Sequence, residues 1–259
     1  MKLCIKRLRV FFFIIVLLIA GFSLWIQDKY VVPILMYHEI EDISRHEANY
    51  VTPKNFERQM AFLEKNHYQV ISLDALVDSI KKGKVLSKKS VVITFDDGKE
   101  NNYTNALAVL KKYNFPATIF VPSGLIGKEK QMSLPQLQEM ISSKIDIGSH
   151  TQTHSYLPGL SVEKQIKEIF DSKKDIEEFL GISVKYFAYP IGGFSDEIKK
   201  LVRQAGYEAA CATNRGRDRF NKDVFELKRI RPNNNDSDLV LWLKTSGYYN
   251  LFRKAKNPY

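Results

Sequence analysis

Four side chains in two short segments have the types and spacing that suit binding of a metal ion. Asp96 and Asp97 are adjacent carboxylates that follow an apolar run and precede Gly98. Neighbouring residues on an extended backbone point in different directions, so one carboxylate can bind a metal while the other faces a substrate. His150 and His154 lie four residues apart, and the chain has only five histidines. Two imidazoles at this spacing can bind one ion if the turn between them is helical.

Each of these segments also has a simpler interpretation. An Asp-Asp-Gly sequence is common in turns that only begin a helix, and two histidines on a surface turn need not share an ion. A third segment, residues 186–193 (YFAYPIGG), runs from an aromatic stretch into a Pro-Gly turn. Its residues Tyr189, Pro190 and Ile191 could form a wall for a sugar ring and offer a backbone N–H to a developing oxyanion. Taken alone, this segment is better explained as an ordinary buried strand and turn.

The elements that must position these residues follow from the alternation of short apolar runs with amphipathic stretches. The predicted strands are residues 33–40, 69–73, 90–95, 117–121, 145–148, 186–189, 207–212 and 227–230. The predicted helices are residues 53–66, 74–80, 101–113, 134–142, 161–180, 196–204 and 237–243. This order favours an α/β fold with a mainly parallel sheet covered by helices, either open or closed into a barrel. The three segments above follow predicted strands, at the carboxyl ends where such folds place their active sites.

Length and composition favour a single large domain over residues 28–259. The chain has 259 residues and is 44% hydrophobic, which suits one barrel-sized domain better than two small ones. Its formal charge of +10 favours loose contact with anionic polymers or lipid head groups, although a mixed and solvated surface explains the charge better. The sequence shows no zinc finger, basic stripe or nucleic-acid module, so nucleic acid is not an expected partner. Nothing in it indicates an obligate protein partner.

Residues 10–26 form a run of 17 residues without a charge, close to the lower limit for crossing a bilayer core of about 30 Å. Aromatic Phe22 and Trp25 crowd its few small residues, which disfavours a cleavage site. We therefore predict a transmembrane anchor or uncleaved signal rather than a cleaved signal peptide or a buried core helix. The basic tip, residues 1–9, would stay in the cytoplasm. The predicted location is a single-pass position in the cell membrane with an extracytoplasmic domain, or secretion if the segment is cleaved.

Taken together, the motifs resemble the polysaccharide deacetylase family, also called the NodB-homology or carbohydrate esterase family 4 domain. The resemblance rests on TFDDG at residues 94–98 and on SHTQTH at residues 149–154, and it extends from about Val32 to Arg231. The opening VPILMYHEI and the later LKRIRP are similar to the branch of biofilm poly-N-acetylglucosamine deacetylases. The resemblance implies a distorted (β/α) barrel of about seven strands.

The resemblance also implies roles for the residues of the two motifs. Asp97, His150 and His154 would bind a divalent metal, with Zn²⁺ as the expected ion. Asp96 would be the general base for an attacking water. The oxyanion would be held by the metal and by a backbone N–H near Ile191.

The sequence departs from the better-known family pattern in two places. The usual members carry an arginine and a tyrosine around the proline of the third motif, where this chain has Ala188 and Ile191. They also carry a later histidine as the general acid, and this chain has no histidine after His154. In the biofilm branch the acid lies near the N-terminus, so His38 would take that role. Either Arg229 or Arg231 could replace the missing arginine and orient Asp96.

The function that these residues favour is a metal-dependent hydrolase acting on an N-acetylated polysaccharide. It would remove N-acetyl groups from poly-N-acetylglucosamine or peptidoglycan and release acetate. An O-acetyl xylan-type esterase would use the same site. A non-catalytic polysaccharide-binding module of the same fold is disfavoured, because such a module does not need both a base and three metal ligands.

Overall fold

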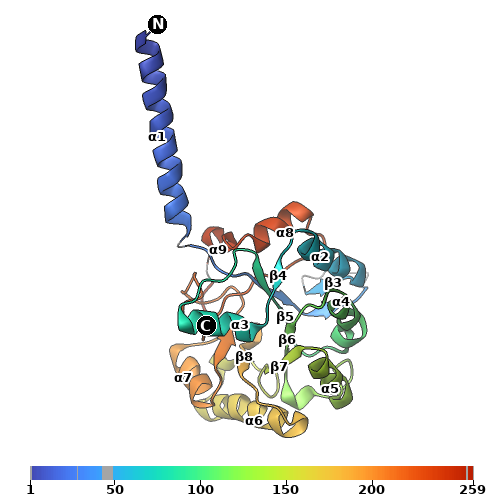
Figure 1. Cartoon of the computed structure of the whole chain (residues 1–259). Coiled ribbons are helices and arrows are strands. Elements are labelled where there is room, and N and C mark those ends of the chain that lie inside the picture. The colour runs from blue at the N-terminus through green and yellow to red at the C-terminus, as the bar shows by residue number, and fades with distance from the viewer. Residues whose placement is uncertain (1, 28, 43–48, 255, 259) are drawn as a thin grey trace.

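A curled sheet of parallel strands forms the centre of the molecule (Figure 1). The computed structural model describes residues 2–27, 29–42, 49–254 and 256–258. The strands lie in the order β1-β5-β6-β7-β8-β9, and β4 pairs with β5 beside this path. Their bounds are β1 Ile34–Tyr37, β4 Gln69–Val70, β5 Ser90–Phe95, β6 Ala117–Val121, β7 Ile145–Ser149, β8 Tyr186–Ala188 and β9 Ala209–Cys211. All the pairings are parallel, which confirms the predicted sheet.

The gap between β9 and β1 is spanned by residues 227–230, which were predicted as a full strand. The structure pairs this segment only through two isolated parallel bridges, Cys211 with Leu227 and Leu35 with Ile230. The backbone N–H of Arg229 donates to the carbonyl of Thr213 at 3.0 Å, which ties the segment to the end of β9. The fold is therefore a curled half-barrel of parallel strands, and this segment places its residues between the two ends of the sheet.

Helices surround the outside of the curled sheet (Figure 1). Their bounds are α2 Pro53–Lys65, α3 Leu73–Lys82, α4 Leu107–Tyr113, α5 Leu134–Ser142, α6 Val162–Leu180, α7 Asp196–Gln204, α8 Asp238–Thr245 and α9 Tyr249–Phe252. Several begin at a serine or threonine whose hydroxyl accepts from a backbone N–H of the first turn, as Thr52, Ser72 and Ser195 do. A π-helical stretch, Asn102–Ala106, precedes α4, and the short strands β2 Glu39–Ile40 and β3 Tyr50–Val51 pair beside it.

Two hydrophobic clusters lie on the two faces of the sheet. Alternate residues of a strand point to opposite faces. In β5, Ile93 and Phe95 pack in the larger cluster with the outer helices, whereas Val92 packs in the smaller one with Phe120 and Leu227. All residues of β5 are buried, which agrees with the continuous apolar run of a strand covered on both faces. The sheet is thus a rigid platform for the loops at its carboxyl edge.

Helix α1, Lys2–Gln27, extends away from this body (Figure 1). The described side chains of its apolar part are largely exposed; Phe12 is 62% and Leu18 is 68% exposed. The side chains of the predicted basic tip lie outside the described residues. Within the part of the chain that the structure describes, no helix combines the length and apolarity needed to cross a membrane, so the predicted span over residues 10–26 is unsupported.

Candidate active site

The predicted catalytic and metal-binding residues meet in one pocket of about 300 Å³. His38 follows β1, Asp96 and Asp97 follow β5, and His150 and His154 follow β7. These three strands run parallel, so their carboxyl ends open on the same edge of the sheet. The fold therefore brings together side chains that are up to 116 residues apart in the sequence.

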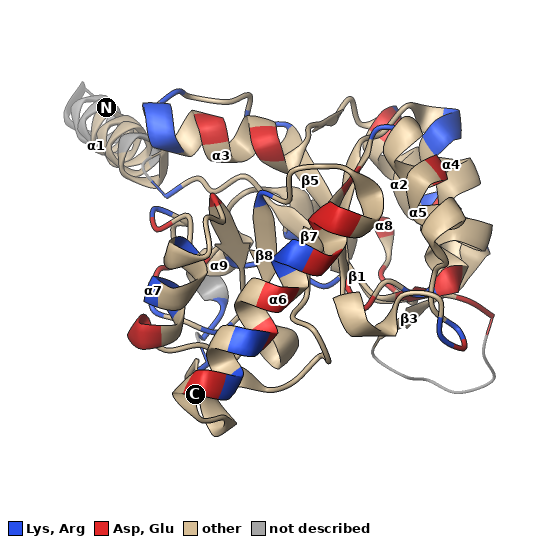
Figure 2. Ribbon diagram, turned by 90° about the horizontal axis from the view of Figure 1, so that it is seen from below, with Lys and Arg blue, Asp and Glu red and all other residues tan. Residues whose placement is uncertain are grey.

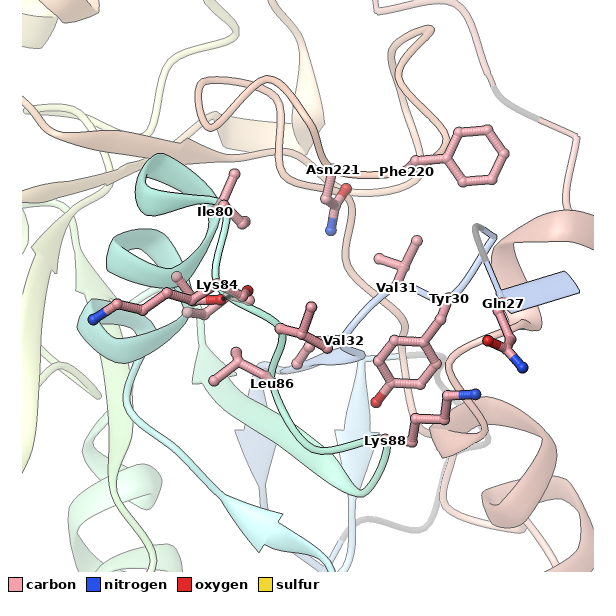
Figure 3. A pocket seen from close by; sticks show the side chains of 14 residues that line it. Gln27, Tyr30, Val31, Val32, Ile80, Lys84, Leu86, Lys88, Phe220 and Asn221 are labelled. Carbon is pink, nitrogen blue, oxygen red and sulfur yellow. Dashed lines mark hydrogen bonds between the residues drawn. The ribbon is translucent and has the colours of Figure 1, made fainter. Parts of the chain in front are cut away.

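A larger cavity of about 350 Å³ lies at the opposite, amino-terminal ends of β1 and β5 (Figure 3). Its lining includes Val32 just before β1 and Lys88 just before β5. No carboxylate and no histidine is among the described residues that line it. The described lining of this cavity has no carboxylate or imidazole that could bind a metal ion, so the smaller pocket is the candidate active site despite its size.

Asp97, His150 and His154 form a triad whose ligand atoms all lie within 4.8 Å of one another. The Oδ1 atom of Asp97 is 3.1 Å from Nε2 of His154 and 3.5 Å from Nε2 of His150. The Nδ1 atom of His150 lies 2.7 Å from the carbonyl oxygen of Ala188, which orients the ring and leaves Nε2 facing the triad. Two imidazoles and one carboxylate are a donor set that suits Zn²⁺ with positions left open. The residues present therefore fit a divalent metal.

The backbone at and beside this triad has positive φ angles at three residues that are not glycine. Asp97, Thr151 and His154 have φ angles of 70°, 66° and 62°, a region that costs a non-glycine residue about 1–3 kcal/mol and that concentrates at functional sites. Gly98 has φ 62°, and a Cβ atom there would lie 2.9 Å from Cγ1 of Val121. The turn after β5 therefore requires glycine at this position, because a side chain would displace β6.

The charges of the triad depend strongly on one another. Burial raises the pKa of Asp97, but hydrogen bonds from His150 and His154 outweigh burial and hold that pKa far below its usual value. Burial lowers the pKa of His150, but the hydrogen bond to Asp97, the charges of Asp96 and Asp97 and the bond to the Ala188 carbonyl together outweigh burial, and the pKa is raised. A carboxylate that stays ionised at any ordinary pH is ready to bind a cation.

Glu168 on α6 holds the loop between the two histidines, and sequence reasoning did not identify it. Its Oε2 accepts from the backbone N–H groups of Gln152 and Thr153, each at 2.9 Å, and its Oε1 accepts from the hydroxyl of Thr153 at 2.6 Å. The side chain is on the inward face of a helix whose outer face carries both signs of charge (Figure 2). Only the register of α6 against the loop could have revealed it.

Removing the Glu168 carboxylate should weaken metal binding. Glu168→Ala leaves two loop N–H groups without their acceptor, and loss of a group that orients metal ligands lowers metal affinity by about 10–100-fold. Metal titration of the purified protein measures the effect. Glu168→Gln, whose amide oxygen can still accept from both N–H groups, should recover part of the affinity. Glu163→Ala, on the exposed first turn of α6, is the matched control and should bind metal like the wild type; unchanged affinity in Glu168→Ala would refute the positioning role.

Arg229 forms a bidentate ion pair with Asp96 in the interior. The Nη1 and Nη2 atoms lie 2.6 and 2.7 Å from the two carboxylate oxygens, and both residues are buried. The Nε atom of Arg229 donates to the carbonyl of Ala212 at 2.9 Å, and Nη1 also reaches the hydroxyl of Thr94 at 3.2 Å. Burial raises the pKa of Asp96, but the charge and hydrogen bonds of Arg229 together with the charges of His150 and His38 outweigh burial, and the pKa is lowered. Of the two predicted arginines, Arg229 is the one that contacts Asp96.

The remaining predicted residues are divided between the pocket and the core. His38, Ile191 and Arg231 line the pocket. Tyr189 does not: it is fully buried, its ring packs against Phe194, and its hydroxyl donates to the carbonyl of Phe225 at 3.0 Å. The predicted sugar wall at Tyr189 and Pro190 is therefore wrong, because both side chains, which follow β8, are buried. Ile191, with φ 57° and 57% exposure, is the residue of this turn that faces outward.

His38 sits in the pocket with one ring nitrogen unpaired. Its Nδ1 is buried and has no hydrogen-bond partner among the described residues. Burial lowers the pKa of His38, against the opposing effect of Asp96 and Asp97. The backbone carbonyl of His38 accepts a hydrogen bond from Nδ2 of Asn102 at 2.6 Å, which fixes the chain after β1. The imidazole thus lines the pocket and has one ring nitrogen that no described residue engages.

Comparison with known proteins identifies the family to which the chain belongs. A sequence model of the family described as polysaccharide deacetylase matches residues 83–210. YxkH of Bacillus subtilis (strain 168), which is named for this family, is 35% identical over 211 residues, covering 81% of this chain and 75% of that protein. A poly-β-1,6-N-acetyl-D-glucosamine N-deacetylase of Staphylococcus aureus (strain MSSA476) is 30% identical over 208 residues, covering 74% of this chain and 67% of that one.

A solved structure shows the same relationship. The Streptococcus pyogenes deacetylase PplD in complex with acetate superposes with a TM-score of 0.77 and 29% identity, covering 83% of this chain and 97% of that chain. This chain belongs to the polysaccharide deacetylase family, whose members are hydrolytic enzymes that depend on a metal. The resemblance drawn from the two motifs is confirmed.

Proposed function

We propose that the protein removes N-acetyl groups from a cell-surface polysaccharide that contains N-acetylglucosamine, either poly-N-acetylglucosamine or peptidoglycan glycan. The observation that carries the proposal is the arrangement of Asp97, His150 and His154 beside Asp96, which Arg229 holds ionised. The N-deacetylase of Staphylococcus aureus is a relative with a named substrate of this class.

The residues of the pocket have separate roles in this reaction. Asp97, His150 and His154 would hold a divalent metal such as Zn²⁺, which would supply Lewis acidity for activating water and polarising the acetyl carbonyl. Asp96, oriented by Arg229, accepts the proton of the attacking water. Ile191 lines the pocket, and a backbone N–H of its turn would donate to the oxyanion. His38 donates a proton to the leaving amine, and a histidine with a lowered pKa is a stronger acid for that step. The products are acetate and a free amine.

An O-acetyl esterase acting on a xylan-type polymer remains the second candidate. The same base and metal ligands would serve an ester, whose leaving alcohol needs less help from an acid than an amine does. An esterase would therefore depend little on His38. His38→Ala separates the two reactions, because only N-deacetylation should collapse in that variant.

Acetate release by the purified full-length chain tests the proposal. The substrates are β-1,6-linked N-acetylglucosamine oligomers, N-acetylated peptidoglycan and acetylxylan, each with added Zn²⁺ or with a chelator. We expect release from an N-acetylated glycan that stops with the chelator and returns with metal. Release from acetylxylan alone would favour the esterase. Absence of release from every substrate, with the metal shown to be bound, would favour a binding module.

We propose in addition that the protein works outside the cytoplasmic membrane, since glycans of this class lie there. The charge-free run over residues 10–26 behind a basic tip motivated this prediction. Protease treatment of intact protoplasts tests it: a protein protected from digestion would lie on the inner side and contradict the proposal.

A further inference from the structure

Three basic side chains line one side of the active-site pocket. Arg215 follows β9, Arg231 follows the segment 227–230, and Lys256 lies beside Arg215 through an isolated bridge. They come from the region between β9 and β1, next to Arg229. Sequence reasoning gave no role to Arg215 or Lys256, because their loops have no periodic pattern and only the fold makes them neighbours.

These cations are not neutralised by the protein within the part that the structure describes. No described carboxylate forms an ion pair with Arg215, Arg231 or Lys256, whereas the outer helices carry both signs side by side (Figure 2). Of the two carboxylates that line the pocket, Asp96 is engaged by Arg229 and Asp97 faces the two histidines. The pocket therefore holds an excess of positive charge, which a bound divalent cation would increase.

Both arginines of this set, Arg215 and Arg231, have contacts that favour binding of a ligand. The Nε and Nη1 atoms of Arg215 donate to the carbonyls of Ile191 and Asn257 at 3.0 and 2.7 Å, so its guanidinium is held in place over the pocket. The Nε atom of Arg231 is buried and has no partner among the described residues. An unpaired guanidinium N–H that is out of contact with water costs free energy unless a ligand satisfies it. A planar guanidinium suits an oxyanion, either a carboxylate or a phosphate.

A neutral N-acetylglucosamine polymer offers no group that would offset this charge. Its deacetylated product carries ammonium groups, which the three cations would repel. An acidic glycan, in contrast, would gain both attraction on approach and hydrogen bonds on binding.

We propose that the enzyme prefers a glycan carrying an oxyanion on or next to the N-acetylated sugar, and that Arg215, Arg231 and Lys256 bind this group. This proposal rests on the proposed deacetylase function and specifies its substrate. The oxyanion is a carboxylate, as on the lactyl group of an N-acetylmuramic unit that carries no stem peptide, or a phosphodiester that joins or substitutes the sugars.

The test compares kcat/KM for acetate release from three oligomers of equal length, with metal added. One is the neutral N-acetylglucosamine oligomer, one carries lactyl carboxylates on alternate sugars, and one carries a phosphodiester. We expect one or both anionic oligomers to be favoured by about tenfold or more at low salt, with the preference shrinking as salt screens the charges. The oligomer that is preferred shows whether the bound oxyanion is a carboxylate or a phosphodiester.

Substitutions assign the preference to the basic side chains. Lys256→Gln and Arg215→Gln should each reduce the anionic-to-neutral ratio of kcat/KM by about three- to tenfold, and Arg215→Lys should retain part of it. Lys174→Gln, at an exposed pair on α6, should leave the ratio unchanged. Equal or better turnover of the neutral oligomer by the wild type would overturn the anion proposal while leaving the deacetylase function intact. Absence of acetate from all three oligomers would count against the deacetylase function itself.

Discussion

Asp96→Asn is expected to keep its metal and to lose nearly all acetate release. The amide cannot accept the proton of the attacking water, and a positioned general base contributes about 10²–10⁴-fold to such a reaction. The metal should remain because Asp97, His150 and His154 form the triad without Asp96. Steady-state kcat and the metal content of the purified variant measure the two effects separately.

The control for this experiment is a variant that lacks a proposed metal ligand and keeps the proposed base Asp96. His154→Ala should lose both the metal and the activity, since its Nε2 atom is 3.1 Å from Asp97 within the triad. In Asp96→Asn, the oxygen of the introduced amide can still accept from Arg229, and a thermal unfolding measurement shows whether the fold is retained. Normal turnover in Asp96→Asn would rule out the base assignment, and loss of metal in that variant would place Asp96 among the ligands.

The elements that the sequence predicted best are those with strong local signals. The β5, β6, α5 and α7 bounds agree with the predicted residues 90–95, 117–121, 134–142 and 196–204. Each strand is a compact apolar run rich in β-branched residues, and α5 and α7 begin at Ser133 and Ser195. Such signals act over a few residues, so they can be read without the fold.

The elements that the sequence predicted poorly depend on distant contacts. Residues 227–230 include apolar positions typical of a strand, yet they pair through only two isolated bridges, one to β9 and one to β1. The predicted strand 33–40 ends at Tyr37 and resumes as β2, which pairs with β3 instead of the main sheet. Part of the predicted helix 101–113 is π-helical. None of these features has a local pattern.

The residues of the candidate site also fall into two groups, those that local sequence motifs predicted and those that only the fold reveals. The two motifs located Asp96, Asp97, His150 and His154, because the residue types and the turns that carry them are adjacent in the sequence. Arg229 was one of two arginines considered, and only the path of residues 227–230 decides between them, since it directs Arg229 inward and Arg231 to the pocket. Glu168 and Arg215 reach the site from separate elements, so no spacing rule could have found them.

The ion pair of Arg229 with Asp96 should make Arg229→Met strongly destabilising. Both partners are buried, and removing the arginine leaves the Asp96 carboxylate without its counter-charge, a change that typically costs about 3–5 kcal/mol. The arginine also links two parts of the fold, the end of β5 through Thr94 and Asp96, and the end of β9 through Ala212. Denaturant unfolding measures the loss of stability, and acetate release should fall because Asp96 is no longer oriented.

A double variant separates the charge from the packing. Asp96→Asn with Arg229→Met removes both charges, and it should recover much of the stability lost in Arg229→Met because no unpaired charge remains in the core. Lys174→Met breaks an ion pair whose side chains are 71% and 62% exposed, and it should change stability little. If the double variant is as unstable as Arg229→Met, packing and the bonds to Ala212 and Thr94 dominate. In that case Arg229 mainly stabilises the fold between β9 and β1, and its orientation of the proposed base Asp96 is secondary.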